Sequence, residues 1–261
     1  MHSVRFEFFE PTSLDEALRL LAESGDQAYL MAGGTDLLVK INHGLLEPKT
    51  VIGLKRIDSL SKITFEPGKG LTIGATALLA DVASHPDILA HYPTVAYAAR
   101  NTANVQIRNM GTVVGNLCNA APSADNAPTL TAMGAEVVIR GRGGERRVAL
   151  EEFFQGPGAT AVQEGEIVTA VFVPIPPERS GTSYKYLSAR GKVDIAAVCV
   201  GVMISLDPEG LCKDARIVLG AVGPTPFRAA EAEALLKGRR LDPELIGRAG
   251  EKASEESRPI T

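Results

Sequence analysis

Two adjacent glycines separate a predicted strand from a predicted helix in the run Ala32-Gly33-Gly34-Thr35-Asp36. Glycine adopts backbone angles that are closed to other residues, so such a turn can direct several N–H groups toward one point. With a helix N-terminus directly behind it, this concavity would attract a phosphate. The same residues also suit a plain strand-to-helix turn in which Thr35 or Asp36 caps the helix. The run is neither GxGxxG nor GxxxxGK[ST], so it indicates neither a Rossmann nucleotide site nor a P-loop.

A second candidate is the polar segment 102–127, which is rich in Asn and Gly and shows little periodicity. Its small residues, Gly115 among them, would let a ligand approach the backbone closely. The polar side chains that could bind such a ligand are those of Thr112, Asn116, Asn119 and Ser123. Asp125 could accept a hydrogen bond from a ribose or ribityl hydroxyl, or could instead cap a helix that starts near Ala127. A polar segment of this length inside a compact chain is more often functional than idle.

We expect no other side chain to act as an acid, base, nucleophile or metal ligand. The three cysteines are widely spaced, and the sequence contains neither a CxxC motif nor a Cys/His cluster. Zinc and iron–sulfur centres are therefore not expected in this chain. Cys118 lies inside the second segment, but packing among small residues is the simpler expectation because no base is near it in sequence.

The N-terminal region predicts a small α/β unit. Ser13 and Glu16 form a capping-box pattern, in which each side chain accepts the other's backbone N–H, ahead of an amphipathic helix. Strands are expected at 28–32 and 50–54, and a helix is expected to begin near Thr35.

The rest of the chain divides at the proline-rich run 174–177. Before it we expect hairpins within 63–74 and 135–149, with a mostly helical stretch at 78–101 between them. After it we expect three strands and then two helices, at 183–188, 198–206, 215–221, 229–236 and 243–253. Strands followed by helices predict an α+β domain with an antiparallel sheet. The predicted domain boundaries are 1–58, 59–176 and 177–261.

Composition and charge exclude several classes of protein. With 27 Lys and Arg against 31 Asp and Glu, the net charge is −4, and no basic run is long enough for a nucleic-acid surface. The first residues carry charge at Arg5 and Glu7 and lack the apolar core of a signal peptide. No run approaches the roughly 18 consecutive apolar residues of a membrane helix. Together with the cysteine pattern, these features predict a cytoplasmic protein.

The pair AGGTD, at 32–36, and GTVVGNLCNAAPSAD, at 111–125, resembles the flavoprotein subunit of the molybdenum hydroxylases. That group includes the medium subunit of carbon monoxide dehydrogenase and the FAD domain of xanthine dehydrogenase. The resemblance covers the whole chain. It includes the runs FFEPTSLDEA, LTIGA, VPIP, DIA and AVGPTPFR, which begin at Phe8, Leu71, Val173, Asp194 and Ala221.

The resemblance implies a PCMH-type FAD-binding fold of two subdomains, 1–58 and 59–176, followed by the flavoprotein C-terminal domain, an α+β domain with an antiparallel sheet. The cofactor would be FAD. Asp125 would bind its ribityl or ribose region, and Phe172 would lie near the isoalloxazine or the adenine. The pyrophosphate and its surroundings would be bound by the two loops, through Ala32, Gly33, Gly34, Thr35, Asp36, Thr112, Gly115, Asn116 and Asn119.

One departure from the family concerns the flavin ring. The family often places a lysine near the ring, eight residues before the Asp of its Asp-Ile-Ala motif. Counted back from Asp194, that position is Tyr186, and Lys185 is one residue off. Either a one-residue shift restores Lys185 or Tyr186 takes its place. A positive charge near the ring would favour the anionic reduced flavin, so the choice affects the reduction potential.

By this resemblance the chain would be an electron-transfer subunit. Its FAD would take electrons from an iron–sulfur small subunit, supplied by a molybdopterin large subunit, and pass them to an acceptor such as NAD⁺ or a quinone. Two alternatives remain: an assembly module that keeps the fold without flavin, and a free-standing flavin oxidase. The Tyr186 register supports the first alternative. The second would require a histidine for covalent attachment beside a glycine loop, and neither loop contains one.

Overall fold

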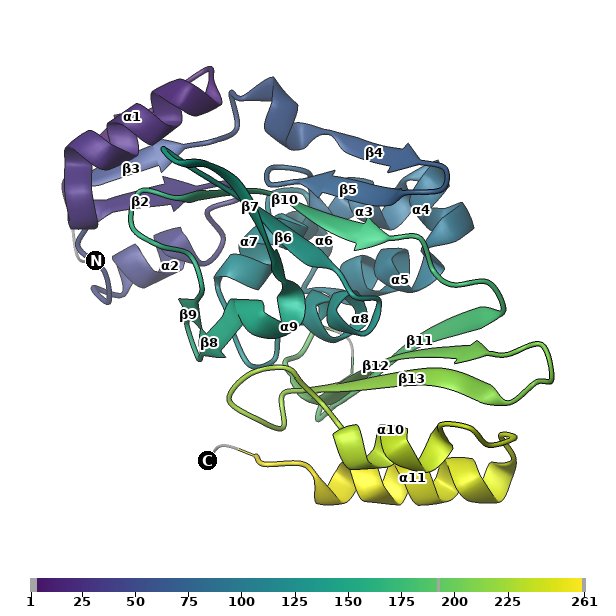
Figure 1. Ribbon diagram of the computed structural model, residues 1–261. Coiled ribbons are helices and arrows are strands. Elements are labelled where there is room, and N and C mark those ends of the chain that lie inside the picture. Colours follow the sequence, from purple (N-terminus) through teal and green to yellow (C-terminus); the bar gives the residue numbers. More distant parts are fainter. Residues whose placement is uncertain (1–3, 192, 260–261) are drawn as a thin grey trace.

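Three main sheets follow one another along the chain (Figure 1). The computed structural model describes residues 4–191 and 193–259. A parallel three-stranded sheet comes first, an antiparallel five-stranded sheet second, and an antiparallel four-stranded sheet third. The mixed α+β architecture predicted from the sequence is therefore confirmed.

The first sheet has the strand order β1-β3-β2. Its strands and helices are β1 (Glu7–Phe9), α1 (Leu14–Ser24), a 3-10 turn (Gly25–Gln27), β2 (Ala28–Met31), α2 (Leu37–Asn42) and β3 (Thr50–Gly53). The capping pattern before α1 forms with one change. Ser13 Oγ accepts from the Glu16 N–H as predicted, at 3.2 Å, but the Glu16 carboxylate accepts from the N–H of Thr12, at 2.9 Å. In a strict capping box the Glu16 carboxylate would accept from the N–H of Ser13, so this bond forms one residue earlier than expected.

The second sheet has the order β4-β5-β10-β6-β7, so a late strand returns to its centre. Its strands are β4 (Ile63–Glu66), β5 (Gly70–Gly74), β6 (Glu136–Gly141), β7 (Gly144–Ala149) and β10 (Ile167–Pro174). A 3-10 turn (Asp58–Ser61) leads into β4, and α9 (Leu150–Phe153), β8 (Phe154–Gly156) and β9 (Ala159–Thr160) connect β7 to β10. Val171 and Val173 of β10 are fully buried on the face that the helices cover.

Six helices fill the connection between β5 and β6. They are α3 (Leu79–Ser84), α4 (Pro86–His91), α5 (Pro93–Asn101), α6 (Val105–Arg108), α7 (Val113–Cys118) and α8 (Asn126–Ala132). The segment 102–127, which looked irregular in sequence, therefore contains α6, α7 and the start of α8. Asn104 caps α6 and Thr112 caps α7 through their side chains. Helices of four to six residues are too short to show a 3.6-residue repeat, which explains the missing periodicity.

The third sheet forms the C-terminal domain, in the order β11-β12-β13-β14. Its elements are β11 (Ser180–Ser188), β12 (Ala196–Leu206), β13 (Cys212–Gly220), β14 (Phe227–Arg228), α10 (Ala230–Leu236) and α11 (Pro243–Glu255). The two final helices cover one face of this sheet, and the other face lies against α8 and α5 (Figure 1). The predicted succession of strands and then helices is confirmed.

Two glycines let the third sheet approach α8 closely. A Cβ atom at Gly201 would lie 2.4 Å from the carbonyl oxygen of Pro128, and one at Gly220 would lie 2.8 Å from the Pro128 ring. The backbone N–H of Ala221 also donates to the carbonyl oxygen of Pro122, at 2.8 Å. Backbone thus packs on backbone where the C-terminal domain meets the preceding domain, which fixes β12 and β13 on the segment around α8.

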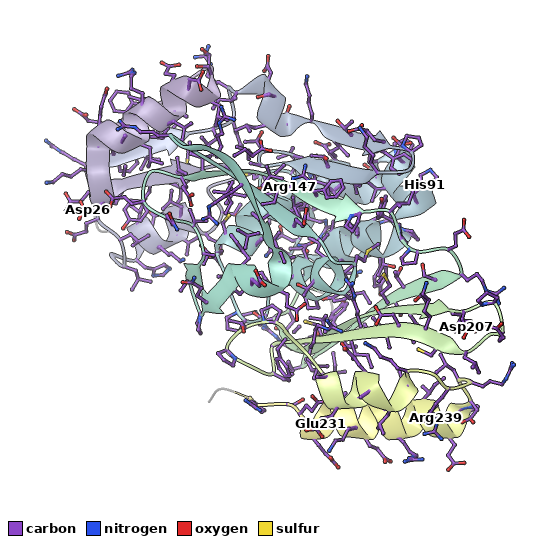
Figure 2. All side chains as sticks on the ribbon, viewed as in Figure 1. Asp26, His91, Arg147, Asp207, Glu231 and Arg239 are labelled. Atoms are coloured by element: carbon purple, nitrogen blue, oxygen red, sulfur yellow. The ribbon has the colours of Figure 1, made fainter. Side chains whose placement is uncertain are left out.

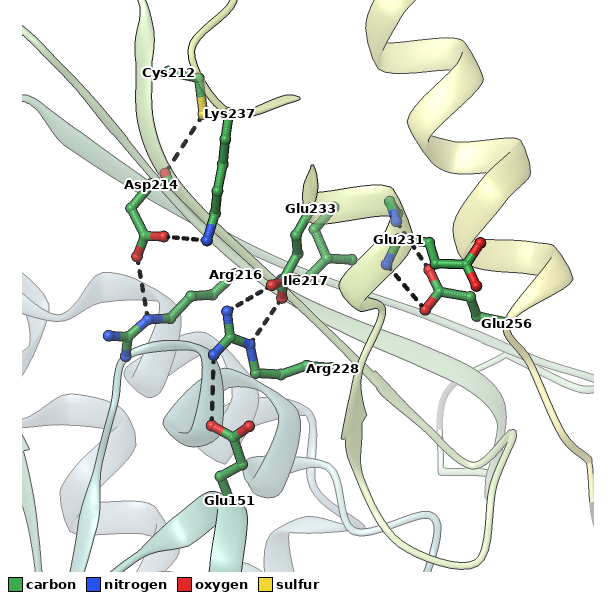
Figure 3. A network of polar contacts seen from close by, with 11 residues as sticks. Glu151, Cys212, Asp214, Arg216, Ile217, Arg228, Glu231, Glu233, Lys237 and Glu256 are labelled. Carbon is green, nitrogen blue, oxygen red and sulfur yellow. Dashed lines mark hydrogen bonds and ion pairs between the residues drawn. The ribbon is translucent and has the colours of Figure 1, made fainter. Parts of the chain in front are cut away.

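An ion pair between Arg228 and Glu233 also lies where the two domains meet, close to α9 (Figure 3). The Glu233 side chain is only 4% exposed and accepts from Arg228 Nε at 3.0 Å and from the backbone N–H of Ile217 at 2.8 Å. Arg228 also reaches Glu151 of α9, at 3.7 Å. Because the Glu233 carboxylate has both a guanidinium and a backbone donor, its charge is compensated inside the domain. Arg228 therefore links α10 to the preceding domain.

Replacing Gly201 with Ala tests the importance of this close approach. The added methyl group would overlap the Pro128 carbonyl, so we expect the free energy of unfolding to fall by about 2 kcal/mol. The matched control is Gly181→Ala in the neighbouring strand, where a Cβ would meet nothing within 4 Å. The control should change stability by less than about 0.5 kcal/mol. Equal effects of both variants in urea unfolding would contradict the packing argument.

Candidate cofactor site

The two loops singled out in the sequence meet at Gly33. A methyl group on this residue would lie 2.4 Å from the carbonyl oxygen of Met110 and 2.7 Å from Cα of Gly111. Only glycine fits this contact. Its neighbour Gly34 has a φ of +73°, in the left-handed region that glycine occupies without strain. The chain reversal after β2 is therefore held against the backbone that leads into α7.

Polar side chains join the same two loops. Asn119 Oδ1 accepts from Lys40 Nζ at 2.8 Å, and Asn119 Nδ2 donates to Asp36 Oδ1 at 3.1 Å. Asp36 stands at the N-cap position of α2 but makes no capping hydrogen bond with its side chain. Its carboxylate is used to bind the second loop, so the simple capping role considered for it from the sequence is not what the structure shows.

The predicted polar residues of the second loop support the backbone. Thr112 is only 2% exposed, and its Oγ1 accepts from the N–H of Gly115 at 2.9 Å. Asn116 Oδ1 accepts from Asn126 Nδ2 at 3.0 Å. The N–H groups of Gly115 and Asn116 also bond to Thr112, so a ligand at this loop would meet mainly the first-turn N–H groups that precede Gly115.

Asp125 connects this region to the C-terminal domain. Its Oδ1 accepts a hydrogen bond from the Tyr184 hydroxyl of β11, at 3.2 Å, and its side chain makes no capping bond to α8. Burial raises the pKa of Asp125 to about 6, and the Tyr184 hydrogen bond partly opposes that rise. A carboxylate accepts several hydrogen bonds, so Asp125 retains acceptor capacity for a ligand hydroxyl.

The structure assigns Lys185 and Tyr186 to opposite faces of the third sheet. Tyr186 pairs with Cys199, and Lys185 pairs with Val200. Val200 packs on the cluster under α10 and α11, whereas Tyr186 stacks on Tyr184 with ring centroids 6.2 Å apart. Tyr186 therefore lies on the face that contains Tyr184 and its bond to Asp125, and the exposed Lys185 points away from it.

Phe172 is not brought to these loops. It alternates with the buried Val171 and Val173 along β10, so its ring lies on the opposite face of the second sheet. There the guanidinium of Arg147 (labelled in Figure 2) stands 4.8 Å from the centre of the Phe172 ring. Arg147 is also 3.4 Å from the Glu136 carboxylate. This arrangement is a surface cation–π contact.

Three residues of the site escaped the sequence analysis. Met110 supplies the carbonyl against Gly33, Lys40 supplies the donor for Asn119, and Tyr184 supplies the donor for Asp125. Lys40 and Tyr184 bond to residues 79 and 59 positions away, so local spacing carries no signal for either contact. The alternation of Tyr184 and Tyr186 in a strand was the one available hint that both share a face.

Over residues 4–191 and 193–259, no group of three or more His, Cys, Asp or Glu side chains could hold a metal ion. In the same part of the chain, no helix is long and apolar enough to cross a membrane. What remains is a site of backbone amides and polar side chains from two loops, next to a domain that contributes an aromatic pair. That combination suits the binding of a nucleotide-type cofactor, whose phosphate oxygens and hydroxyl groups can bond to such groups.

Comparisons with known proteins agree with this class. Residues 4–176 match the family described as the FAD binding domain in molybdopterin dehydrogenase, and residues 182–261 match the CO dehydrogenase flavoprotein C-terminal domain. The chain therefore belongs to the FAD-binding subunits of the molybdenum hydroxylase-type dehydrogenases. It is an oxidoreductase subunit, and its cofactor is FAD.

Relatives with several different names cover nearly all of the chain. The nicotinate dehydrogenase FAD-subunit of Eubacterium barkeri is 33% identical over 92% of this chain and 82% of its own length. The carbon monoxide dehydrogenase medium chain of Hydrogenophaga pseudoflava is 32% identical over 95% and 86%. Among solved structures, reconstituted CO dehydrogenase from Oligotropha carboxidovorans superposes with a TM-score of 0.93 at 31% identity, covering 100% of this chain and 90% of the other.

The residues of the site fit such a cofactor. Gly33 and Gly34 leave backbone without side chains at the point where the two loops converge. Asn126 Oδ1 is buried beside Asn116 and has no hydrogen-bond partner among the described residues. Bare backbone and an unsatisfied acceptor are features that a ligand rich in phosphate oxygens and hydroxyl groups can use.

The raised pKa of Asp125 predicts a pH-dependent cost in stability. An ordinary aspartate has a pKa of about 3.9, so between about pH 4 and pH 6 the folded chain binds the extra proton. The free energy of unfolding therefore falls as the pH rises from about 4 to about 6, and it stays lowered at higher pH. We expect Asp125→Asn to be more stable than the wild type by about 1–2 kcal/mol at pH 8.

This advantage should shrink toward zero near about pH 3, where both the folded and the unfolded states of the wild type hold the proton. Urea unfolding of the chain without FAD at the two pH values measures the difference. Asp26→Asn, which removes an exposed carboxyl group, controls for the change in net charge. A stability difference for Asp125→Asn that is the same at both pH values would show that this carboxyl is not perturbed by burial.

Proposed function

We propose that this chain is the flavin-bearing electron-transfer subunit of a multi-subunit dehydrogenase. The observation that carries the proposal is the contact of Gly33 with the Met110–Gly111 backbone, which joins two loops that have few free side chains. When bound, FAD supplies two-electron and one-electron redox chemistry. The protein's own residues bind and orient it. No side chain of this chain is required as an acid, base or nucleophile.

The loops would hold the pyrophosphate through their main chain. Ala32, Gly33, Gly34 and Thr35 form the turn before α2, and Thr112 to Asn116 form the first turn of α7. The Lys40–Asn119–Asp36 bridge would keep the two sets of N–H groups at a constant separation. Asp125 would accept a hydrogen bond from a ribose or ribityl hydroxyl, as the resemblance implies.

Tyr186 fits better than Lys185 as the ring-side residue. It shares the face of β11 with Tyr184 and Asp125, whereas Lys185 is exposed on the other face. A neutral phenol in that position would stabilise the anionic reduced flavin less than a lysine would. We therefore expect a lower reduction potential than in relatives with a lysine there. The position of Phe172 gives no support to its proposed contact with the cofactor.

The partners proposed are an iron–sulfur small subunit and a molybdopterin large subunit. Electrons would enter from the iron–sulfur subunit and leave to an acceptor such as NAD⁺ or a quinone. Relatives that match nearly all of this chain carry the names nicotinate, glyceraldehyde and carbon monoxide dehydrogenase. Such different substrate names on similar subunits suggest that the substrate is bound by the molybdenum subunit. The described cysteines are unpaired, as suits the cytoplasmic location that we also propose.

Gly33→Ala is expected to lower FAD affinity by about tenfold or more, because each 1.4 kcal/mol of lost binding energy is a factor of ten. The added methyl group would separate the loops at Met110. Gly34→Val should act in the same direction, since its Cβ would lie 3.1 Å from Met31 Sδ at a positive φ. Visible absorption of the purified chain, followed by identification of the cofactor released by heat, measures FAD occupancy.

Gly143→Ala is the matched control for these glycine variants. It lies in the turn between β6 and β7, where a Cβ would meet nothing within 4 Å, and it should retain wild-type occupancy. Full FAD occupancy in Gly33→Ala and Gly34→Val would refute the placement of the cofactor at this junction.

The direction of electron flow can be tested without knowledge of the substrate. In the anaerobic complex purified with its partner subunits, we expect either NADH or a quinol to bleach the flavin absorption, because electron transfer is reversible. The iron–sulfur centre of the partner subunit, monitored by its paramagnetic signal, should become reduced after the flavin does. A flavin that neither donor reduces would contradict the proposed acceptor classes, and a complex without an iron–sulfur subunit would contradict the proposed partner.

A further inference from the structure

One hydrogen bond to a residue of the proposed FAD site comes from the C-terminal domain. Tyr184 belongs to β11, is only 3% exposed, and donates its phenolic proton to Asp125 at the start of α8. We infer that Tyr184 is a positioning residue, whose hydroxyl holds the Asp125 carboxylate in the orientation that receives a cofactor hydroxyl. This inference rests on the proposed function, because it requires Asp125 to bind FAD. The C-terminal domain would then complete the cofactor site.

The Tyr184 ring is fixed by its surroundings. Tyr97 of α5 meets it edge-on at 6.3 Å, and Tyr186 stacks beside it at 6.2 Å. Ala98, Ala196 and Cys199 form a small buried cluster with it. A ring packed on both sides has few rotamers available, so its hydroxyl oxygen has a defined place relative to Asp125.

The strand that carries Tyr184 is also fixed on the preceding domain. Gly201 of β12, which pairs with Tyr184, packs directly on the backbone of Pro128 and Thr129. Two residues before Tyr184, the hydroxyl group of Thr182 contacts that of Thr94 in α5. β11 is thus held to α5 through Thr182 and, through its partner strand β12, to α8, which begins next to Asp125. A shift of the C-terminal domain would move the Tyr184 hydroxyl away from Asp125.

The protonation states give this bond its direction. Burial raises the pKa of Tyr184 far above its ordinary value, so the phenol keeps its proton. Cys199 of β12 lies next to this pair, and burial raises the pKa of its thiol to about 12, so it stays neutral. Near neutral pH the Asp125 carboxylate is therefore the acceptor and Tyr184 is the donor. Tyr97, on α5, contacts the Tyr184 ring rather than Asp125.

Loss of the Tyr184 hydroxyl should have two effects. The carboxylate would lose the donor that orients it, and its pKa would rise further because the Tyr184 hydrogen bond favours the ionised form. FAD is expected to bind better when Asp125 is ionised. As the pH is lowered, the affinity of the variant for FAD should therefore begin to fall at a higher pH than that of the wild type. We expect Tyr184→Phe to bind FAD about fivefold more weakly near neutral pH, as is typical for one hydrogen bond. The difference in FAD affinity between the variant and the wild type should become smaller toward about pH 8, where Asp125 is ionised in both.

The experiment measures the FAD dissociation constant of the full chain by fluorescence titration, from about pH 5 to about pH 8. Tyr92→Phe is the matched control. Its hydroxyl is also buried and bonds to the Val173 and Pro174 carbonyl oxygens, within the second subdomain and away from Asp125. The control should lose some stability but keep the wild-type pH profile for FAD. Identical FAD profiles for Tyr184→Phe and the wild type would overturn the inference, as would an equal loss at every pH in both variants.

Two further measurements separate this inference from the proposed function. If Asp125→Asn and Gly33→Ala leave FAD affinity unchanged, the proposed site itself is wrong. If those variants weaken binding and Tyr184→Phe does not, only the role of Tyr184 is wrong. The carbon-13 carboxyl resonance of Asp125, followed in the chain without FAD, tests the bond directly. Its midpoint should lie near the pKa of about 6 in the wild type and higher in Tyr184→Phe, and equal midpoints would overturn the inference.

Discussion

The contact between Gly33 and the Met110–Gly111 backbone is the constraint on which the rest of the site depends. It brings together a strand-to-helix turn of the first sheet and the entry to α7, two segments nearly eighty residues apart in sequence. No side chain fits between them, so the loops present backbone rather than side chains to a ligand. The bridge from Lys40 through Asn119 to Asp36 then sets their separation. The family that residues 4–176 match binds FAD, and the proposed site of the cofactor is at this glycine contact.

The region around α8 is the second element that shapes the molecule. The third sheet packs on this region through Gly201 and Gly220, and Asp125 stands at the N-terminal end of α8. A domain that packs backbone on backbone cannot slide without a large loss of contact. The same rigidity that joins the domains also delivers Tyr184 to a carboxylate of the cofactor region. Domain packing and the proposed cofactor site are therefore linked through one short segment.

Burial sets the chemistry of this link. Asp125 is an acid held where its charged form is disfavoured, and the stability lost there is typical of residues retained for binding rather than for folding. By contrast, the Glu233 carboxylate is compensated by Arg228 and by the N–H of Ile217, and these contacts attach α10 to β13 and, through Arg228, to α9 (Figure 3). The two carboxylates thus differ in how their charge is compensated, because one faces a guanidinium and the other faces a neutral phenol.

Residue type and spacing alone predicted the local pieces: the α1 cap at Ser13, the hairpins, the strand-then-helix order of the C-terminal domain, and the two loops with their glycines. These depend on neighbours within a few residues, which spacing and residue type reveal. Residue type and spacing gave no information on α6 and α7, which are shorter than any repeat that could signal them. Packing of distant segments places Tyr186 on the face of β11 that carries the Tyr184–Asp125 bond and Lys185 on the opposite face, puts Phe172 on the far face of its sheet, and brings Tyr184 to another domain. Each of those outcomes depends on strand register and on contacts between distant segments, which packing of the whole chain fixes.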